Sequence, residues 1–296
     1  MRLKTAQDFD QELLILFDAY VHGTLDRRGF LDRAQKFAVG GMTAGMLLAA
    51  LSPDFARAQV VPKDDKRIIT ERAEYPSTAG TGTVKGYLAK PASATGKLPV
   101  VLVVHENRGL NPHIEDITRR LALDNFVAFA PDALTPLGGY PGDEDKAREL
   151  FAKLDQKKAT EDFVAAANYL KSRPESSGKM GVVGFCYGGG MAHTLSVRMP
   201  ELNAAVPFYG NHPAAEDAVK VRAPLLIHFA GVDERINSAW PAYEAALKAA
   251  GTRYTAHQYA STQHGFNNDT TPRFDAAAAK LAWERTLAFF NAQLRA

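Results

Sequence analysis

Short uninterrupted apolar runs recur along the chain from residue 98 onward. The first run, Leu98–Val104, carries no polar side chain and gives way to the polar stretch His105–Gly109. Such a run is typical of a strand that helices cover on both faces, because none of its positions has to meet water. Further strands are predicted at 126–132, 180–183, 204–210, 223–230 and 254–259.

Segments with helical periodicity separate these runs. Helices are predicted at 114–123, 160–172, 239–250 and 274–294. In the second of them, Phe163, Ala166 and Leu170 fall on one face. Strands that alternate with helices predict an α/β fold, with a mainly parallel sheet and helices on both faces. In such a sheet, ligands and catalytic groups gather where the strands end.

The strand at 180–183 runs into Gly184–Gly188, and the middle residue of this segment is Cys186. This is the G-x-nucleophile-x-G pattern of a strand that turns sharply into a helix, here with a thiol in place of a hydroxyl. Glycine at both ends lets the turn tighten without a Cβ clash. The backbone N–H groups and the dipole at the start of the helix favour a thiolate. The alternative is a buried structural cysteine.

Two further residues follow predicted strands in the order acid, then base. Asp233 lies just after the strand at 223–230, and His264 lies just after the strand at 254–259. The order nucleophile, acid, base is the one found in the α/β-hydrolase fold. Cys186, His264 and Asp233 are therefore a candidate triad of nucleophile, general base and orienting carboxylate. Each residue alone has an ordinary structural explanation, but all three at strand ends predict an enzyme.

Four motifs together resemble the dienelactone hydrolase (carboxymethylenebutenolidase) family. They lie at 104–109, 184–190, 231–233 and 264–266, and the resemblance extends from residue 68 to the last residue. It implies the α/β-hydrolase fold for a domain at 59–296. It also implies an enzyme that opens a lactone or cleaves an ester through a cysteine nucleophile and an acyl-enzyme.

The resemblance implies roles for three residues outside the triad. Glu106 matches a glutamate that holds the resting thiol protonated and takes its proton when substrate displaces it. A carboxylate beside a thiol disfavours the thiolate and can accept a hydrogen bond from the S–H group. The backbone N–H groups of Tyr187 and Asn107 would form the oxyanion hole. The simpler alternative for Glu106 is a cap of the helix that follows it.

The chain departs from the family pattern where a substrate carboxylate is bound. The family places one arginine four residues after the catalytic histidine, where this chain has Asn268, and a second in the region of 133–137, which holds no basic residue here. The resemblance therefore implies an ester or lactone substrate without identifying it. Arg108 or Arg235 could supply a cation instead, although a structural or solvated role explains either one.

Composition narrows the class of function. The chain has 296 residues, 46% of them hydrophobic, and a formal charge of +2 without a basic patch, so no nucleic-acid partner is predicted. Its single cysteine excludes an internal disulfide and leaves a thiol redox protein, one alternative, without a resolving cysteine. No metal-ligand spacing or cofactor motif is present, and no oligomeric state is predicted. The other alternative is a non-catalytic protein of the same fold that binds a small ligand.

The first 58 residues follow a different pattern. Arg27-Arg28, followed by Phe30-Leu31, resembles the twin-arginine export motif. The apolar stretch at 37–51 is uncharged and too short for an ordinary transmembrane helix. Ala56-Arg57-Ala58 before Gln59 fits a small-x-small cleavage site. The expectation is a leader that directs export to the periplasm.

The alternative for the same residues is a helical segment that the mature protein keeps in the cytoplasm. Phe9, Leu13, Phe17 and Tyr20 fall on one helical face, which suits a helix docked against a core as well as a leader. No stable membrane span is predicted under either interpretation.

Overall fold

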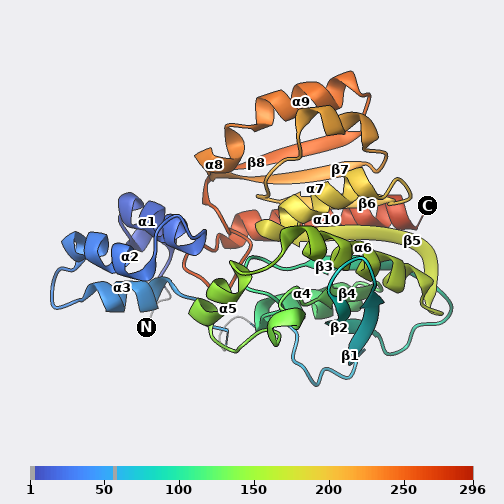
Figure 1. Ribbon diagram of the computed structural model, residues 1–296, viewed down its shortest axis with the longest axis horizontal. Helices are drawn as coiled ribbons and strands as arrows, with labels where there is room; N and C mark the ends of the chain where they lie inside the picture. Colours follow the sequence, from blue (N-terminus) through green and yellow to red (C-terminus); the bar gives the residue numbers. More distant parts are fainter. Residues whose placement is uncertain (1–3, 56–58, 296) are drawn as a thin grey trace.

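The computed structural model describes residues 4–55 and 59–295. Its strands form one eight-stranded sheet in the order β1-β2-β4-β3-β5-β6-β7-β8 (Figure 1). Neighbouring strands are parallel from β4 to β8 along this order, so the predicted mainly parallel α/β sheet is confirmed. The strands are β1 Ile68–Ser77, β2 Gly82–Pro91, β3 Leu98–Val104, β4 Val127–Pro131, β5 Ser176–Phe185, β6 Ala204–Phe208, β7 Leu225–Val232 and β8 Tyr254–Gln263.

Two antiparallel strands extend the sheet at one edge. β1 pairs with β2, and β2 pairs with β4. The search for apolar runs missed both. In β2 the apolar run between Lys85 and Lys90 is short, and β1 is an edge strand, which alternates buried and exposed side chains when one face meets solvent. In β1, for example, Ala73 and Tyr75 are buried, whereas Arg72 and Glu74 are exposed.

Helices fill most of the connections between strands. The four predicted helices correspond to α4, α6, α9 and α10, whereas α5 and the short α8 were not predicted. α6 begins earlier than predicted because the Asp155 side chain caps its first turn, accepting hydrogen bonds from the backbone of Lys157 and Lys158. The helices are α4 Pro112–Leu123, α5 Glu144–Phe151, α6 Gln156–Ser172, α7 Tyr187–Arg198, α8 Glu234–Asn237, α9 Trp240–Ala249 and α10 Ala276–Leu294, with short 3-10 helices at Thr135–Leu137 and Ala215–Lys220.

The sheet divides the hydrophobic core into two clusters. Helices α6, α7 and α9 pack on one face, and α4 and α10 pack on the other (Figure 1). Along β3, Val100, Leu102 and Val104 join the first cluster, while Val101 and Val103 join the second. This division follows from the geometry of a strand, in which successive side chains point to opposite faces. The predicted coverage of both faces is therefore confirmed.

Residues 4–55, called the N-terminal segment below, fold into short helices around an apolar core of their own. Leu13, Phe17 and Tyr20, which share the predicted helical face, are buried in this core, and Phe9 packs against it. The helices are α1 Gln11–Val21, α2 Arg27–Ala34 and α3 Ala44–Leu51, with short 3-10 helices at Ala6–Asp8 and Gln35–Phe37.

The apolar stretch at 37–51 thus ends in a short helix that packs on its neighbours. Within residues 4–55 and 59–295, no helix is long and apolar enough to cross a membrane. The expected cleavage motif at 56–58 lies outside the described residues. Twin-arginine export and cleavage before Gln59 stay predictions.

Polar contacts dock the N-terminal segment beside α5, close to the loops that follow the parallel strands (Figure 1). Asp18 Oδ1 lies 3.3 Å from Arg273 Nη1. Asp145, in the first turn of α5, accepts hydrogen bonds from Tyr20 and, at 2.5 Å, from Arg27 Nη1. The segment therefore covers the region where the sequence predicts the candidate site.

The turn that carries Cys186 has the predicted strained geometry. Cys186 follows β5, precedes α7 and has a positive φ of 56°. A Cβ atom on Gly184 would lie 1.9 Å from the carbonyl oxygen of Gly188, and one on Gly188 would lie 2.2 Å from that of Val104. Glycine at both positions is therefore required for the turn to close against β3.

Gly188→Ala is expected to lower the free energy of unfolding by about 3 kcal/mol, because the added methyl group overlaps the backbone of β3. Gly190→Ala is the matched control in the same helix. Its Cβ would lie no closer than 3.5 Å to another atom, and alanine favours a helix over glycine by ~1 kcal/mol. Denaturant titrations compare the variants with the wild type. Equal loss of stability in both variants would contradict the close approach at Gly188.

Candidate active site

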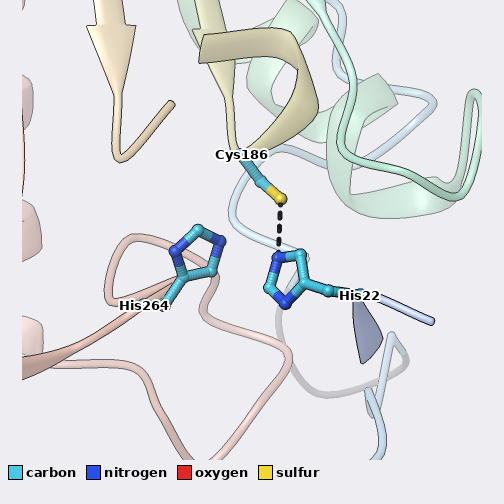
Figure 2. A group of neighbouring side chains, drawn as sticks. All are labelled: His22, Cys186 and His264. Carbon is cyan, nitrogen blue, oxygen red and sulfur yellow. Dashed lines mark hydrogen bonds between the residues drawn. The ribbon is translucent and has the colours of Figure 1, made fainter. Parts of the chain in front are cut away.

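Cys186 lies where β5 turns into α7, and its side chain faces the N-terminal segment (Figure 2). The exposed fraction of Cys186 is 8%. Its backbone N–H donates to the carbonyl oxygen of Phe208 over 3.0 Å, which ties the turn to β6. The Sγ atom lies 3.3 Å from Nε2 of His22. The thiol is therefore buried and within hydrogen-bond distance of an imidazole.

His264 and Asp233 follow the neighbouring strands β8 and β7. Nδ1 of His264 lies 2.6 Å from Oδ2 of Asp233, and both side chains are buried. This contact keeps a proton on Nδ1, so that Nε2 of a neutral ring can accept one. Nε2 is buried and has no hydrogen-bond partner within the described parts of the chain. One nitrogen of each histidine and the Cys186 sulfur lie within 4.8 Å of one another.

The second imidazole beside the thiol belongs to His22, which the sequence interpretation missed. His22 directly follows α1, and its side chain is only 12% exposed. Its Nδ1 lies 2.8 Å from the backbone oxygen of Asp18 and 3.3 Å from the Asp18 carboxylate. The only sequence signal was the spacing of an aspartate and a histidine one helical turn apart. The thiol thus lies between two histidines, each with an aspartate at Nδ1.

The two imidazoles control the ionisation of the thiol. Burial raises the pKa of Cys186, but His264 and His22 outweigh this effect and lower the pKa to about 5. Burial lowers the pKa of His264, yet the charge of Cys186 and the hydrogen bond to Asp233 raise it overall. Burial also lowers the pKa of His22, but the charge of Cys186 raises it, and the pKa of His22 is raised overall. A thiolate beside protonated imidazole is therefore favoured near neutral pH.

Glu106 lies near the thiol, but its side-chain hydrogen bond is with another residue. Its Oε2 accepts a hydrogen bond from Nδ2 of Asn268 over 2.8 Å. Both residues line a small cavity of about 40 Å³ together with Cys186 and His264. The side-chain amide of Asn268 therefore holds the Glu106 carboxylate in place. The role of Glu106 as a proton acceptor for the thiol stays a prediction.

Tyr187 follows Cys186 in the chain, and Asn107 lines the same cavity as both. Tyr187 is the first residue of α7, so its backbone N–H has no acceptor within the helix. Asn107 lies in the loop after β3, and its Nδ2 donates to the carbonyl oxygen of Val21 over 2.8 Å. The N-terminal segment therefore fixes the loop that carries Asn107. An oxyanion hole formed by these two backbone N–H groups stays a prediction.

A cavity of about 540 Å³ opens beside Cys186. Arg235 lines it, whereas Arg108 is buried with its Nε 3.7 Å from the Glu144 carboxylate. The cavity thus carries more cationic than anionic side chains. Its lining includes Val21–Gly23 from the N-terminal segment, the aromatic residues Tyr187 and Tyr209, the cations Arg148, Lys153 and Arg235, and the acid Glu149.

His22, Cys186 and His264 also have the side chains and spacing of a metal site. They are the one such group within residues 4–55 and 59–295. The sequence showed no metal-ligand spacing because His22 lies far from the other two along the chain. Nη2 of Arg235 lies 3.1 Å from His22 Nε2 and 3.4 Å from His264 Nδ1. A guanidinium cation thus lies within hydrogen-bond distance of one candidate ligand, His22.

Comparisons with known proteins match both parts of the chain. The model of the dienelactone hydrolase family matches residues 84–294, and a model described as YqhI-like matches residues 1–39. The first range holds every site residue predicted from the sequence, and the second holds His22.

Three relatives illustrate the extent of the similarity. The "Putative hydrolase fragment YghX" of Escherichia coli (strain K12) is 53% identical over 114 residues, which cover 38% of this chain and 97% of the relative. A "Putative carboxymethylenebutenolidase" of Escherichia coli O157:H7 is 31% identical over 247 residues, or 78% and 90% of the two chains. The crystal structure of a "Putative Dienelactone Hydrolase" from Klebsiella pneumoniae is 29% identical, with a TM-score of 0.67 over 75% of this chain and 98% of that one.

The rate of Cys186 alkylation by iodoacetamide is expected to reach half its maximum near pH 5, because the pKa of the thiol is lowered to about 5 and only the thiolate reacts. Glu106→Gln removes a negative charge close to the thiol and should move this midpoint to lower pH. Glu149→Gln, which changes an acid of the larger cavity, is the control. Mass spectrometry of samples quenched across the pH range measures all three proteins.

Two outcomes would contradict this electrostatic account. A wild-type midpoint near the ordinary thiol pKa of about 8.5 would mean that the imidazoles do not compensate for burial. Identical profiles for Glu106→Gln and the wild type would place Glu106 outside the electrostatic surroundings of the thiol.

Proposed function

This chain belongs to the dienelactone hydrolase family, and from that premise we propose that it cleaves a carboxylic ester or lactone with Cys186 as its nucleophile. The observation that carries the proposal is the contact of 2.6 Å between Nδ1 of His264 and Asp233. The other ring nitrogen of His264, Nε2, is buried and has no hydrogen-bond partner within the described residues. An oriented imidazole beside a thiol in a strained turn is the arrangement that nucleophilic catalysis needs. A protein that only binds a ligand has no use for it.

In the first half of the reaction, the thiolate of Cys186 attacks the carbonyl carbon and forms a C–S bond. The carbonyl electron pair moves onto oxygen, and the backbone N–H groups of Tyr187 and Asn107 stabilise the resulting negative charge. Collapse of this intermediate restores the carbonyl group and breaks the C–O bond. The departing alcohol oxygen takes a proton from Nε2 of His264, which leaves a thioester on the enzyme.

In the second half, water replaces the alcohol. His264 takes a proton from the water as its oxygen attacks the thioester carbon. The C–S bond then breaks, so that the acid product leaves and the thiolate returns. Asp233 keeps the His264 ring in one orientation through both halves and stabilises its protonated form. The buried contact between the two side chains supports this role, since without it the His264 ring could rotate and Nε2 would no longer face the reacting atoms.

Glu106 is proposed to control how much of the resting thiol stays protonated. It lines the same small cavity as Cys186, and the amide of Asn268 holds its carboxylate there. The carboxylate disfavours the thiolate, while the two histidines favour it. The alkylation profile of Glu106→Gln tests this role.

Cys186→Ala is expected to abolish the hydrolysis of aryl esters, because no bond to the acyl group can form without the sulfur. His264→Ala should lower kcat by about a thousandfold through loss of the general base. His257→Ala is the control, since His257 lies on the same strand, β8, and does not line the cavity beside Cys186. The substrate panel should include esters that carry a carboxylate, because cations predominate in the lining of that cavity.

Steady-state rates of the purified full-length variants decide between the classes of function. Wild-type turnover by Cys186→Ala would contradict the proposed nucleophile. Tight binding of a panel member without hydrolysis would favour a binding protein instead. Thiol-dependent redox activity without ester cleavage would favour the redox alternative.

A further inference from the structure

The hydrogen-bond partner of the proposed nucleophile comes from outside the α/β domain. Sγ of Cys186 lies 3.3 Å from Nε2 of His22, and Figure 2 shows this imidazole and that of His264 facing the sulfur from different sides. The two rings meet edge to face, with centroids 4.7 Å apart and an interplanar angle of 83°. His264 approaches from the loop after β8, whereas His22 approaches from the N-terminal segment.

His22 is oriented in the same way as the proposed base. Its Nδ1 faces the backbone oxygen and the carboxylate of Asp18, which mirrors the contact between His264 and Asp233. A proton held on Nδ1 leaves Nε2 as the acceptor, and Nε2 is the atom nearest the thiol. Asp18 is held in turn by Arg273 at 3.3 Å. The orientation of His22 therefore depends on a chain of partly buried polar contacts rather than on the ring alone.

The end of α1, directly before His22, is fixed against the loop that carries Asn107. The carbonyl oxygen of Val21 accepts hydrogen bonds from Nδ2 of Asn107 over 2.8 Å and from Nη1 of Arg108 over 3.3 Å. Both donors come from the turn directly after β3. This contact places His22 at a defined distance from the region where a substrate carbonyl would lie. Val21–Gly23 also form one wall of the cavity of about 540 Å³.

We propose that His22 is a second catalytic histidine, which the N-terminal segment contributes to the ionisation of Cys186. The proton leaves Sγ for Nε2 of His22, while Nε2 of His264 already carries, from solvent, the proton that the departing alcohol later takes. The S–H bond breaks, its electron pair stays on sulfur, and an N–H bond forms on the imidazole. The thiolate then lies between two imidazoles that together compensate for its charge. This inference rests on the proposed function, because it assigns a role to His22 through Cys186 as the nucleophile.

Other charged groups also face His22, and each has a separate effect. Asp18 stabilises the protonated ring, and His264 opposes it. Nη2 of the exposed Arg235 lies 3.1 Å from Nε2, so that Arg235 and the thiol compete for one acceptor. If the guanidinium of Arg235 alone stabilised the thiolate, His22 would fill space beside the thiol without accepting its proton. An Arg235→Gln variant therefore has to accompany any His22 variant.

The proposal requires the N-terminal segment in the active enzyme. A chain that begins at Gln59 would lose His22, Asp18 and one wall of the cavity together. It follows that the fate of residues 1–58 determines the chemistry of Cys186 as well as the location of the protein.

The test compares full-length wild type, His22→Ala, His22→Gln, Arg235→Gln and the control His257→Ala. Two pH profiles are measured, the alkylation rate of Cys186 and kcat/KM for an aryl ester. Both His22 variants should move the alkylation midpoint upward by at least about one pH unit, because an imidazole that accepts the proton is lost. The acidic limb of kcat/KM should move with it. Glutamine is similar in size to the imidazole and remains informative if alanine loosens the segment.

The readouts separate this proposal from the proposed function. If wild type shows no hydrolysis that depends on Cys186, the proposed function fails, and the role of His22 in catalysis fails with it. If hydrolysis is present but both His22 variants keep the wild-type midpoint, only the role of His22 is overturned. A shift in Arg235→Gln that equals the shift in His22→Ala would also overturn it.

Two analyses of the isolated wild type complete the test. Elemental analysis should find no stoichiometric metal, whereas one zinc ion per chain that is lost in His22→Ala would make the group a metal site instead. Intact mass should show residues before Gln59 in the active fraction. Activity that belongs entirely to chains beginning at Gln59 would overturn the proposal.

Discussion

A buried thiol ionises near neutral pH where nearby positive charge or hydrogen-bond donors replace the solvation it has lost. At Cys186 this compensation comes from two imidazoles, and much of the remaining architecture serves to hold them there. The loops after β7 and β8 bring Asp233 and His264 together, and the N-terminal segment brings His22. Burial alone would raise the pKa of this thiol, and the two histidines act in the opposite direction.

The backbone makes its own contribution at the same point. Cys186 has a φ of 56°, which a residue with a side chain adopts only at a cost. The flanking glycines allow β3, β5 and α7 to approach closely, and a side chain at either glycine would overlap the neighbouring backbone. The sulfur is thereby fixed between the sheet edge and the N-terminal segment. The rigid turn and the two imidazoles therefore act on the same atom, the sulfur of Cys186.

The sequence predicted the parts of the structure that have a strong local pattern. The central parallel strands were recognisable because burial on both faces makes them continuously apolar. Cys186 and Asp233 were recognisable because each directly follows such a strand, and His264 was recognisable because it follows the strand-like edge segment that forms β8. The edge strand β1 alternates in polarity, β2 has only a short apolar run between two lysines, and α5 is a short polar helix, so none of the three gave a comparable signal.

The contacts around Glu106 and His22 could not be predicted in this way. That Asn268 binds Glu106 follows from how the loops after β3 and β8 meet, which the spacing of residues does not reveal. His22 is further removed, because its position depends on the docking of the whole N-terminal segment through contacts such as that of Asp18 with Arg273. Patterns within a segment predict its helices, but the surface on which it docks depends on the tertiary fold.

The central claim is that Cys186 carries the acyl group during catalysis, and trapping of the acyl-enzyme tests it most directly. Full-length protein is mixed with an excess of an activated aryl ester, quenched in acid within the first turnovers, and analysed by intact and peptide mass spectrometry. The account predicts a mass increase equal to the acyl group, located on the peptide that contains Cys186 and absent from Cys186→Ala. Burst kinetics with the acyl group on another residue, or sustained turnover by Cys186→Ala, would contradict it.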